Sequence, residues 1–142
     1  MATNEPPMDD EQETEPFDNE EEGYSRPIGK LCLALFQEAI EAGATEIQIR
    51  PVVEPPAEPQ MRLRLRVNGE LIPGTMVLPW PHYHHLISRF KKMSQMDVAV
   101  RHSPQSGKMG FKFGEKVIYM TLQMQPIHDY ESCVIYFDKK KS

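Results

Sequence analysis

The sequence predicts an α+β fold in which two helices pack on a mainly antiparallel sheet. Three observations predict it: two segments with apolar residues every three to four positions, several short segments of alternating apolar and polar residues, and an Asn-Gly pair between two of these. The expected order is helix, three strands, helix, three strands, which makes a two-layer sandwich. The 142 residues suffice for one such domain and a tail.

The first ordered element is expected to begin near Pro27. A helix is predicted from there to about Ile40, because its apolar side chains form one stripe, and Gly43 is suited to end it. Alternation over residues 46–50 predicts a short strand. The proline-rich segment 53–59 predicts a loop, since proline cannot donate to a strand ladder.

Residues 61–67 form the clearest predicted strand. Apolar side chains alternate there with Arg62, Arg64 and Arg66, so one face is apolar and the other carries guanidinium groups. The pair Asn68-Gly69 follows at once and predicts a tight hairpin, because both central turn residues need a positive φ. Residues 70–72 are then the return strand.

A second helix is predicted to open at Pro79 and Pro81 and to reach about Met96. Its expected buried side consists of Tyr83, Leu86, Ile87, Phe90 and Met93, and its expected exposed side of Arg89, Lys91 and Lys92. Further strands are predicted over residues 108–113, 116–123 and 133–137, after a loop over residues 103–107.

Charge is distributed unevenly along the chain. Residues 1–26 contain ten acidic residues and one basic residue, a net charge of −9, whereas residues 27–142 contain 11 acidic and 15 basic residues, a net charge of +4. The composition predicts a disordered acidic tail over 1–26, a folded domain over 27–138 and a basic end over 139–142. Such a tail either solubilises the protein or attracts a basic surface.

The cysteines and the lack of long apolar segments predict the cellular compartment. Cys32 and Cys133 lie far apart in apolar surroundings, which is typical of reduced, buried thiols. No signal peptide and no apolar segment of about 18 residues occurs. A cytoplasmic location without membrane insertion is therefore expected.

Motifs for nucleotide hydrolysis and metal catalysis are missing from the 142 residues. Gly29-Lys30 and Gly107-Lys108 lack the earlier glycine and the following Ser or Thr of a phosphate-binding loop. His82 and His85 are one helical turn apart and His84 lies between them, but no third ligand stands at a supporting spacing. Exposed imidazoles are favoured over a metal site, and the prediction is a protein without catalytic activity or cofactor.

A basic face is the remaining candidate site. Guanidinium groups that project from one side of a strand are good ligands for phosphate or carboxylate. The same alternation is also typical of a solvated outer sheet face. The residues that supply the positive charge are Arg62, Arg64, Arg66, Arg89, Lys91, Lys92 and Arg101.

Several segments, in order, match short motifs of one family. Residues 42–51 (AGATEIQIRP) are similar to GASDIHIEP, residues 64–69 (RLRVNG) to RxRxDG, and residues 87–99 to ISRIKxMAxLDIA. Residues 104–108 (PQSGK) are similar to PQDGR, and residues 125–135 to LPTxxGESVVLR. These motifs belong to the N-terminal, pre-motor domain of type II secretion and type IV pilus assembly ATPases, which the chain resembles over about residues 28–138.

The resemblance implies a PAS-like domain whose arginines approach nucleotide bound to an adjoining RecA-type motor. By resemblance, Arg64 and Arg66 match the strand arginines, and Arg89, Arg101 and Lys108 match basic positions of the helix and the following loop. With Arg62, these are the candidate phosphate- or partner-binding residues. Asn68, Ser106, Thr121 and Tyr136 depart from the family pattern, which has Asp, Asp, Arg and Arg there. The resemblance predicts a stand-alone chain without the motor.

Two functions follow as hypotheses. The first is a non-catalytic adaptor or regulatory domain that binds a secretion or pilus motor ATPase, or another assembly protein, and for which homo-oligomerisation is open. The alternative is a module that binds nucleic acid or nucleotide phosphate through the same basic face. Few aromatic residues are interleaved with the arginines, which disfavours nucleic acid because stacking platforms need them.

Overall fold

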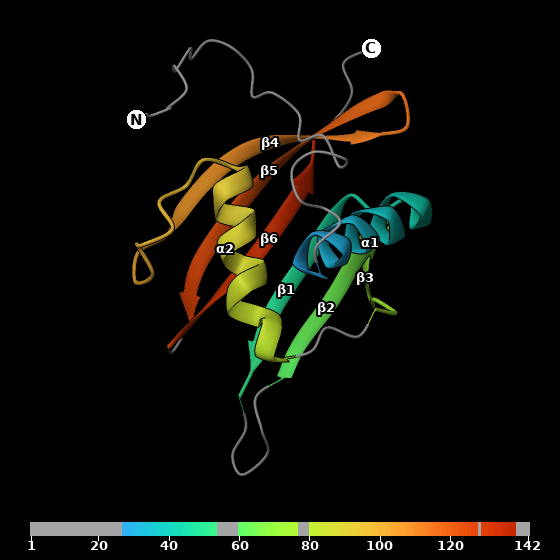
Figure 1. Ribbon diagram of the computed structural model, residues 1–142. Coiled ribbons are helices and arrows are strands. Elements are labelled where there is room, and N and C mark those ends of the chain that lie inside the picture. Colours follow the sequence, from blue (N-terminus) through green and yellow to red (C-terminus); the bar gives the residue numbers. More distant parts are fainter. Residues whose placement is uncertain (1–26, 54–59, 77–79, 128, 139–142) are drawn as a thin grey trace, which may run out of the picture.

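The computed structural model describes residues 27–53, 60–76, 80–127 and 129–138 (Figure 1). The predicted acidic tail, the basic end and most of the predicted loop over 53–59 lie outside the described residues. The elements are α1 (Pro27–Ala42), β1 (Glu46–Val52), β2 (Gln60–Val67), β3 (Glu70–Pro73), the 3-10 helix η1 (Trp80–His82), α2 (Tyr83–Met93), β4 (Gln105–Phe113), β5 (Lys116–Ile127) and β6 (Tyr130–Phe137).

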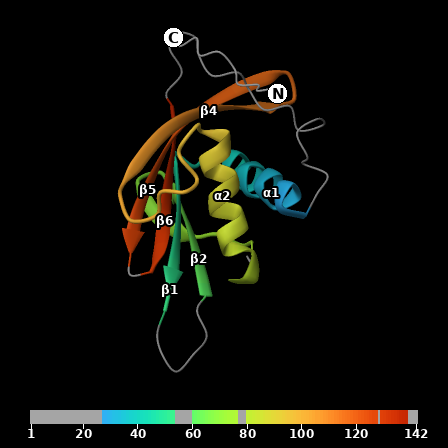
Figure 2. The same ribbon diagram turned by 60° about the vertical axis from the view of Figure 1, so that its left-hand side comes forward.

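The six strands form one antiparallel sheet in the order β3-β2-β1-β6-β5-β4. It consists of two three-stranded meanders, β1 to β3 and β4 to β6, and within the described residues these pair with each other only through β1 and β6. Both helices cover the same face of the sheet (Figure 2). The predicted two-layer α+β sandwich and the predicted order of elements are confirmed.

Helix α1 buries the apolar stripe predicted for it, including Cys32, Leu35 and Phe36. It ends where Gly43 adopts a φ of +74°, a conformation that glycine reaches without a side-chain clash. The Gly43 and Ala44 amides donate to the carbonyls of Ile40 and Ala39 at 3.1 and 3.0 Å, so the last turn keeps its carbonyls satisfied.

The turn between β2 and β3 is the one expected from Asn68-Gly69. The two residues have φ values of 54° and 83°, as a type I′ turn requires. This turn pairs Val67 with Glu70 and thereby fixes the register of β2. Leu63 and Leu65 consequently face the helices and are buried, and the arginines that alternate with them face away from the helices.

Helix α2 is shorter than predicted. It begins at Tyr83 after the 3-10 turn, and it ends at Met93 because Gln95 adopts a φ of 65°. The Met96 amide then donates back to the Lys91 carbonyl at 2.8 Å, which closes the helix end. The predicted buried side of this helix is confirmed at all five positions.

The prediction that Lys91 is exposed is wrong. Its side chain is 1 % exposed, and its ammonium group lies 2.8 Å from Glu131 Oε1 and donates to the Val100 carbonyl at 2.6 Å. A buried ammonium group needs such partners to offset the loss of hydration. Lys91 is part of α2 as predicted, but its side chain lies on the buried side of the helix and not on the exposed side.

The last three strands are longer than predicted. Strand β4 begins at Gln105, inside the segment expected to be a loop, and β5 continues to Ile127. The strand start is possible because Gly107 passes directly against the backbone carbonyl of Ser94, where a Cβ would collide. The Gln105 side chain accepts from the Asp97 amide at 2.9 Å and donates to the Asp97 carbonyl at 3.0 Å, which holds the preceding loop.

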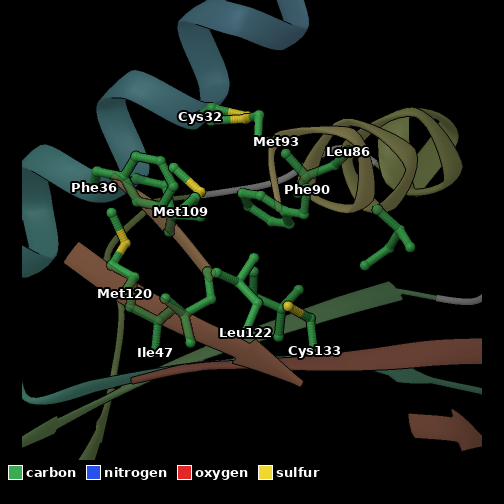
Figure 3. Packing of buried hydrophobic residues seen from close by; sticks show 14 of the residues in the cluster. Cys32, Phe36, Ile47, Leu86, Phe90, Met93, Met109, Met120, Leu122 and Cys133 are labelled. Carbon is green, nitrogen blue, oxygen red and sulfur yellow. The ribbon is translucent and has the colours of Figure 1, made fainter. Parts of the chain in front are cut away.

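The core lies between the helices and the sheet (Figure 3). The Phe36 ring of α1 lies 4.7 Å from the Phe111 ring of β4 and 5.9 Å from the Phe90 ring of α2. Several methionines fill the remaining space, as their flexible side chains allow. The buried methionines are Met93, Met96, Met109, Met120 and Met124.

Candidate functional site

The sheet face that carries no helix is called here the open face. Cross-strand pairing places one row of its residues side by side on five strands, from β2 to β4. Arg66 pairs with Glu46, Glu46 with Tyr136, Tyr136 with Thr121, and Thr121 with Lys108. The predicted arginine-bearing strand therefore belongs to a broad surface that extends across most of the sheet.

Three arginines gather at one part of the open face. Arg50 of β1 pairs directly with Arg62 of β2, and Arg64 follows two residues further along β2. We call these three residues the guanidinium cluster. Among the described residues the side chains of these three arginines make no hydrogen bond and no ion pair. Like charges directly opposite each other destabilise a sheet, so the cluster is not explained by the stability of the fold.

Arg66 lies on the same strand but serves the fold. Its Nε lies 3.0 Å from Glu46 Oε1, and its Nη1 donates to the Gly69 carbonyl at 3.1 Å. Gln48 donates to the other Glu46 oxygen at 2.7 Å. These contacts tie the Asn68-Gly69 turn to β1, and they leave Arg66 less available to a ligand than Arg64.

Lys108 lies on β4, four strands away from Arg66 along the sheet. Its ammonium group is 3.5 Å from Asp138 Oδ2, and the Thr121 hydroxyl donates to the other Asp138 oxygen at 3.0 Å. Because the Lys108 side chain is 66 % exposed, this ion pair is weak in water. Lys108 marks the far end of the open face.

The structure does not bring all six predicted residues together. Arg62, Arg64, Arg66 and Lys108 are on the open face, whereas Arg89 is on α2 in the helical layer. Arg101 is exposed in the loop between α2 and β4. A binding role for any of the six stays a prediction.

Sequence reasoning did not single out Arg50 or the exposed aromatic residues of the open face. Tyr119 and Tyr136 are 42 % and 38 % exposed, and Val117 is 37 % exposed beside them on β5. We call these three the aromatic patch. A Cβ on Gly110 would lie 2.9 Å from the Tyr119 ring, so the glycine gives that ring room to lie on β4. Alternation with buried Met120 and Leu122 is the signal that could have revealed the patch.

The histidines do not form a metal site with other ligands in the described part of the chain. No group of three or more His, Cys, Asp or Glu side chains gathers there. His84 packs 5.9 Å from the Tyr130 ring, whereas His82 and His85 line a cleft beside α1. None of the described helices is long and apolar enough to cross a membrane.

The two thiols are buried and free in the structure. Burial raises the pKa of Cys32 to about 12, although the positive charge of Arg89 acts in the opposite direction. Burial also raises the pKa of Cys133, and the nearby Glu131 charge adds to this. Neither thiol has the low pKa of a nucleophilic cysteine.

Comparison with known proteins points to one family. The family described as "Type II/IV secretion system protein" matches residues 21–142. The Type II secretion system ATPase E of Vibrio cholerae is 30% identical over 110 residues, which are 77% of this chain and 20% of that protein. The putative type II secretion system protein E of Escherichia coli is 30% identical over 122 residues, 85% of this chain and 23% of that protein.

A pilus protein is similar as well. The Type IV pilus assembly ATPase PilB of Myxococcus xanthus is 30% identical over 88 residues, which cover 62% of this chain and 14% of that protein. The chain thus spans about a fifth of the length of the first curated relatives that it matches.

Proposed function

Since the chain belongs to the type II/IV secretion system protein family, we propose that it is a non-catalytic adaptor or regulatory domain. It is related to the N-terminal region of secretion ATPases. The proposed partner is a motor ATPase of a secretion or pilus machine, or another assembly protein. The 142 residues contain no phosphate-binding loop, so the proposed role includes no nucleotide hydrolysis by this chain.

The guanidinium cluster is the single observation that carries this proposal. Its three side chains have no partners in the described part of the protein. The direct pairing of Arg50 with Arg62 places two like charges opposite each other, which lowers stability. A partner that supplies carboxylates would form charge-assisted, bidentate hydrogen bonds with them and offset that cost. The aromatic patch on the same face adds the kind of apolar contact that is enriched in protein interfaces.

The proposed partner surface is therefore acidic with an apolar part. It would lie on the open face, opposite the helices, and contact Arg64 and Tyr136 together. Arg66 would contribute mainly by holding the β2–β3 turn in place, because Glu46 already occupies its guanidinium group.

The test uses the purified motor ATPase of the machine from the same cell and the full chain. Arg64→Glu is expected to weaken binding in biolayer interferometry by about tenfold or more, because one charge-assisted contact becomes repulsive. Lys30→Glu makes the same charge change at an exposed residue of α1, in the helical layer, and is the matched control, with affinity expected to stay unchanged. Equal affinity for both variants and the original protein would remove the open face as the binding surface.

Nucleic-acid binding is the second candidate, and the guanidinium cluster with Tyr119 and Tyr136 on the same face favours it. Phosphate contacts by several cations predict steep salt dependence, and exposed aromatic rings stack on bases. A fluorescence titration with single- and double-stranded oligonucleotides tests this. Salt-sensitive binding that Arg64→Glu abolishes would support this candidate, and absence of salt-sensitive binding would eliminate it.

A further inference from the structure

A second basic surface lies in the helical layer. An open cleft of about 460 Å³ separates the first turn of α1 from one side of α2. Its lining residues from α1 are Ile28 and Gly29, and those from η1 and α2 are His82, His85, Ser88, Arg89 and Lys92. The five residues from η1 and α2 are spaced three or four positions apart or adjacent, so they share one side of the helical segment.

The chemistry of this cleft is cationic. Arg89 and Lys92 carry positive charge, His82 and His85 can carry it, and Ser88 offers a hydroxyl donor. None of the seven described lining residues is acidic. Of these two lining residues Lys92 is exposed and Arg89 is half-buried.

The first turn of α1 adds to this charge. The first amides of a helix have no partner within the helix, and the helix dipole gives that end a partial positive charge. The first turn of α1 contains no acidic residue to neutralise it. A helix start together with arginine, lysine and a hydroxyl is a combination that suits phosphate oxygens.

We propose that this cleft binds a small molecule that carries a phosphate or diphosphate group. The phosphate oxygens would lie between the start of α1 and Arg89 and Lys92, with Ser88 as a further donor. A metal ion fits less well, because His82 and His85 have no third ligand among the described residues. The volume is in the range of small-molecule sites. The site is independent of the proposed function, since it lies on the other layer from the open face.

Titration of the full chain with inorganic pyrophosphate, followed by amide NMR and calorimetry, tests the proposal. Saturable binding with shifts at Gly29, Ser88 and Lys92 is expected. Lys92→Glu with His85→Ala should weaken it by about tenfold or more, because one cationic contact becomes repulsive and one imidazole is lost. Lys112→Glu on β4, an exposed lysine outside the cleft, is the matched control and should bind as the original protein does.

A parallel titration with ADP distinguishes the source of the phosphate. Tighter binding of ADP than of pyrophosphate would identify a nucleoside phosphate, and equal binding would identify the phosphate group alone as the ligand. The proposal is overturned if neither compound binds saturably at millimolar concentration. It is also overturned if Lys112→Glu weakens binding as much as the double variant does.

Discussion

Lys91 of α2 and Glu131 of β6 form an ion pair of 2.8 Å inside the protein, where the two residues are 1 % and 7 % exposed. The Tyr83 hydroxyl donates to the Glu131 backbone carbonyl, so one residue of β6 receives two side chains from the same helix. The Lys91 ammonium group also holds the Val100 carbonyl of the following loop. Helix α2 is thus fixed to the sheet by polar contacts as well as by apolar packing.

Loss of the Lys91 charge should destabilise the fold strongly. Lys91→Met leaves the Glu131 carboxylate buried without its partner, and such changes cost about 3–5 kcal/mol. Chemical denaturation of the original protein and the variant measures the difference. The double variant Lys91→Met with Glu131→Leu should recover much of the loss, because an apolar pair replaces the ion pair without leaving a charge. A single variant as stable as the original protein would contradict the assigned role of the pair.

The buried thiols predict a stability that falls in alkaline solution. Burial raises the pKa of Cys32 from an ordinary value of 9.0 to about 12. Above pH 9 the unfolded thiol loses its proton while the folded one keeps it, so the free energy of unfolding decreases as pH rises from about 9 to 12. Burial acts in the same direction on Cys133 and Tyr83.

Denaturation at pH 8, 9 and 10 measures this decrease. Cys32→Ala should make the decline shallower, because it removes one of the three groups. A thiol reagent should label neither cysteine in the native protein and both in denaturant, since only the unfolded chain exposes them. Rapid labelling of the native protein would show that the burial is incomplete.

Gly107 is predicted to be intolerant of any side chain. A Cβ at this position collides with the backbone carbonyl of Ser94, which cannot move as a flexible side chain can. Gly107→Ala should therefore destabilise the protein by roughly 1–3 kcal/mol, in the range of overpacked positions. Thermal unfolding checks this. Ser106→Ala, on the neighbouring exposed residue, should leave the melting temperature nearly unchanged.

The guanidinium cluster predicts a change that stabilises the fold and weakens partner binding. Arg62→Glu replaces a like-charge pair with Arg50 by an opposite-charge pair, and cross-strand pairs differ by about 0.2–1 kcal/mol. The melting temperature should rise slightly, while affinity for the proposed motor partner should fall. An Arg62→Glu variant that gains stability and retains full affinity would separate the cluster from binding.

The fold was predictable from sequence because its strongest signals are local. Asn68-Gly69 fixes one turn, Gly43 ends one helix, and the stripe around Phe36 and Phe90 defines the helical layer. Element ends were less predictable. Helix α2 ends earlier than predicted because Gln95 adopts a positive φ. Strand β4 begins earlier than predicted because Gly107 contacts Ser94, and these two residues are too far apart in sequence to give a local signal.

The candidate site was predictable only where one strand carries it. Alternation placed Arg62, Arg64 and Arg66 on one face of β2, but Arg50 joins them only through the pairing of β1 with β2. Lys91 shows the same limit, because its burial depends on Glu131, 40 residues away. Charge alone does not reveal which cations are already paired.

The junction between the two meanders also bears on how the chain reaches its native state. Strands β1 to β3, and strands β4 to β6, each pair between neighbours along the chain, whereas β1 meets β6 through partners such as Ile47 and Ile135. Joining strands so far apart in sequence requires closure of a long loop. The entropy of the loop is lost before the contacts between the strands can compensate for it, so this step is slow. We therefore expect the encounter of β1 with β6 to limit the rate of folding, and in stopped-flow refolding Ile135→Val should retard folding more than the same loss at a hairpin end.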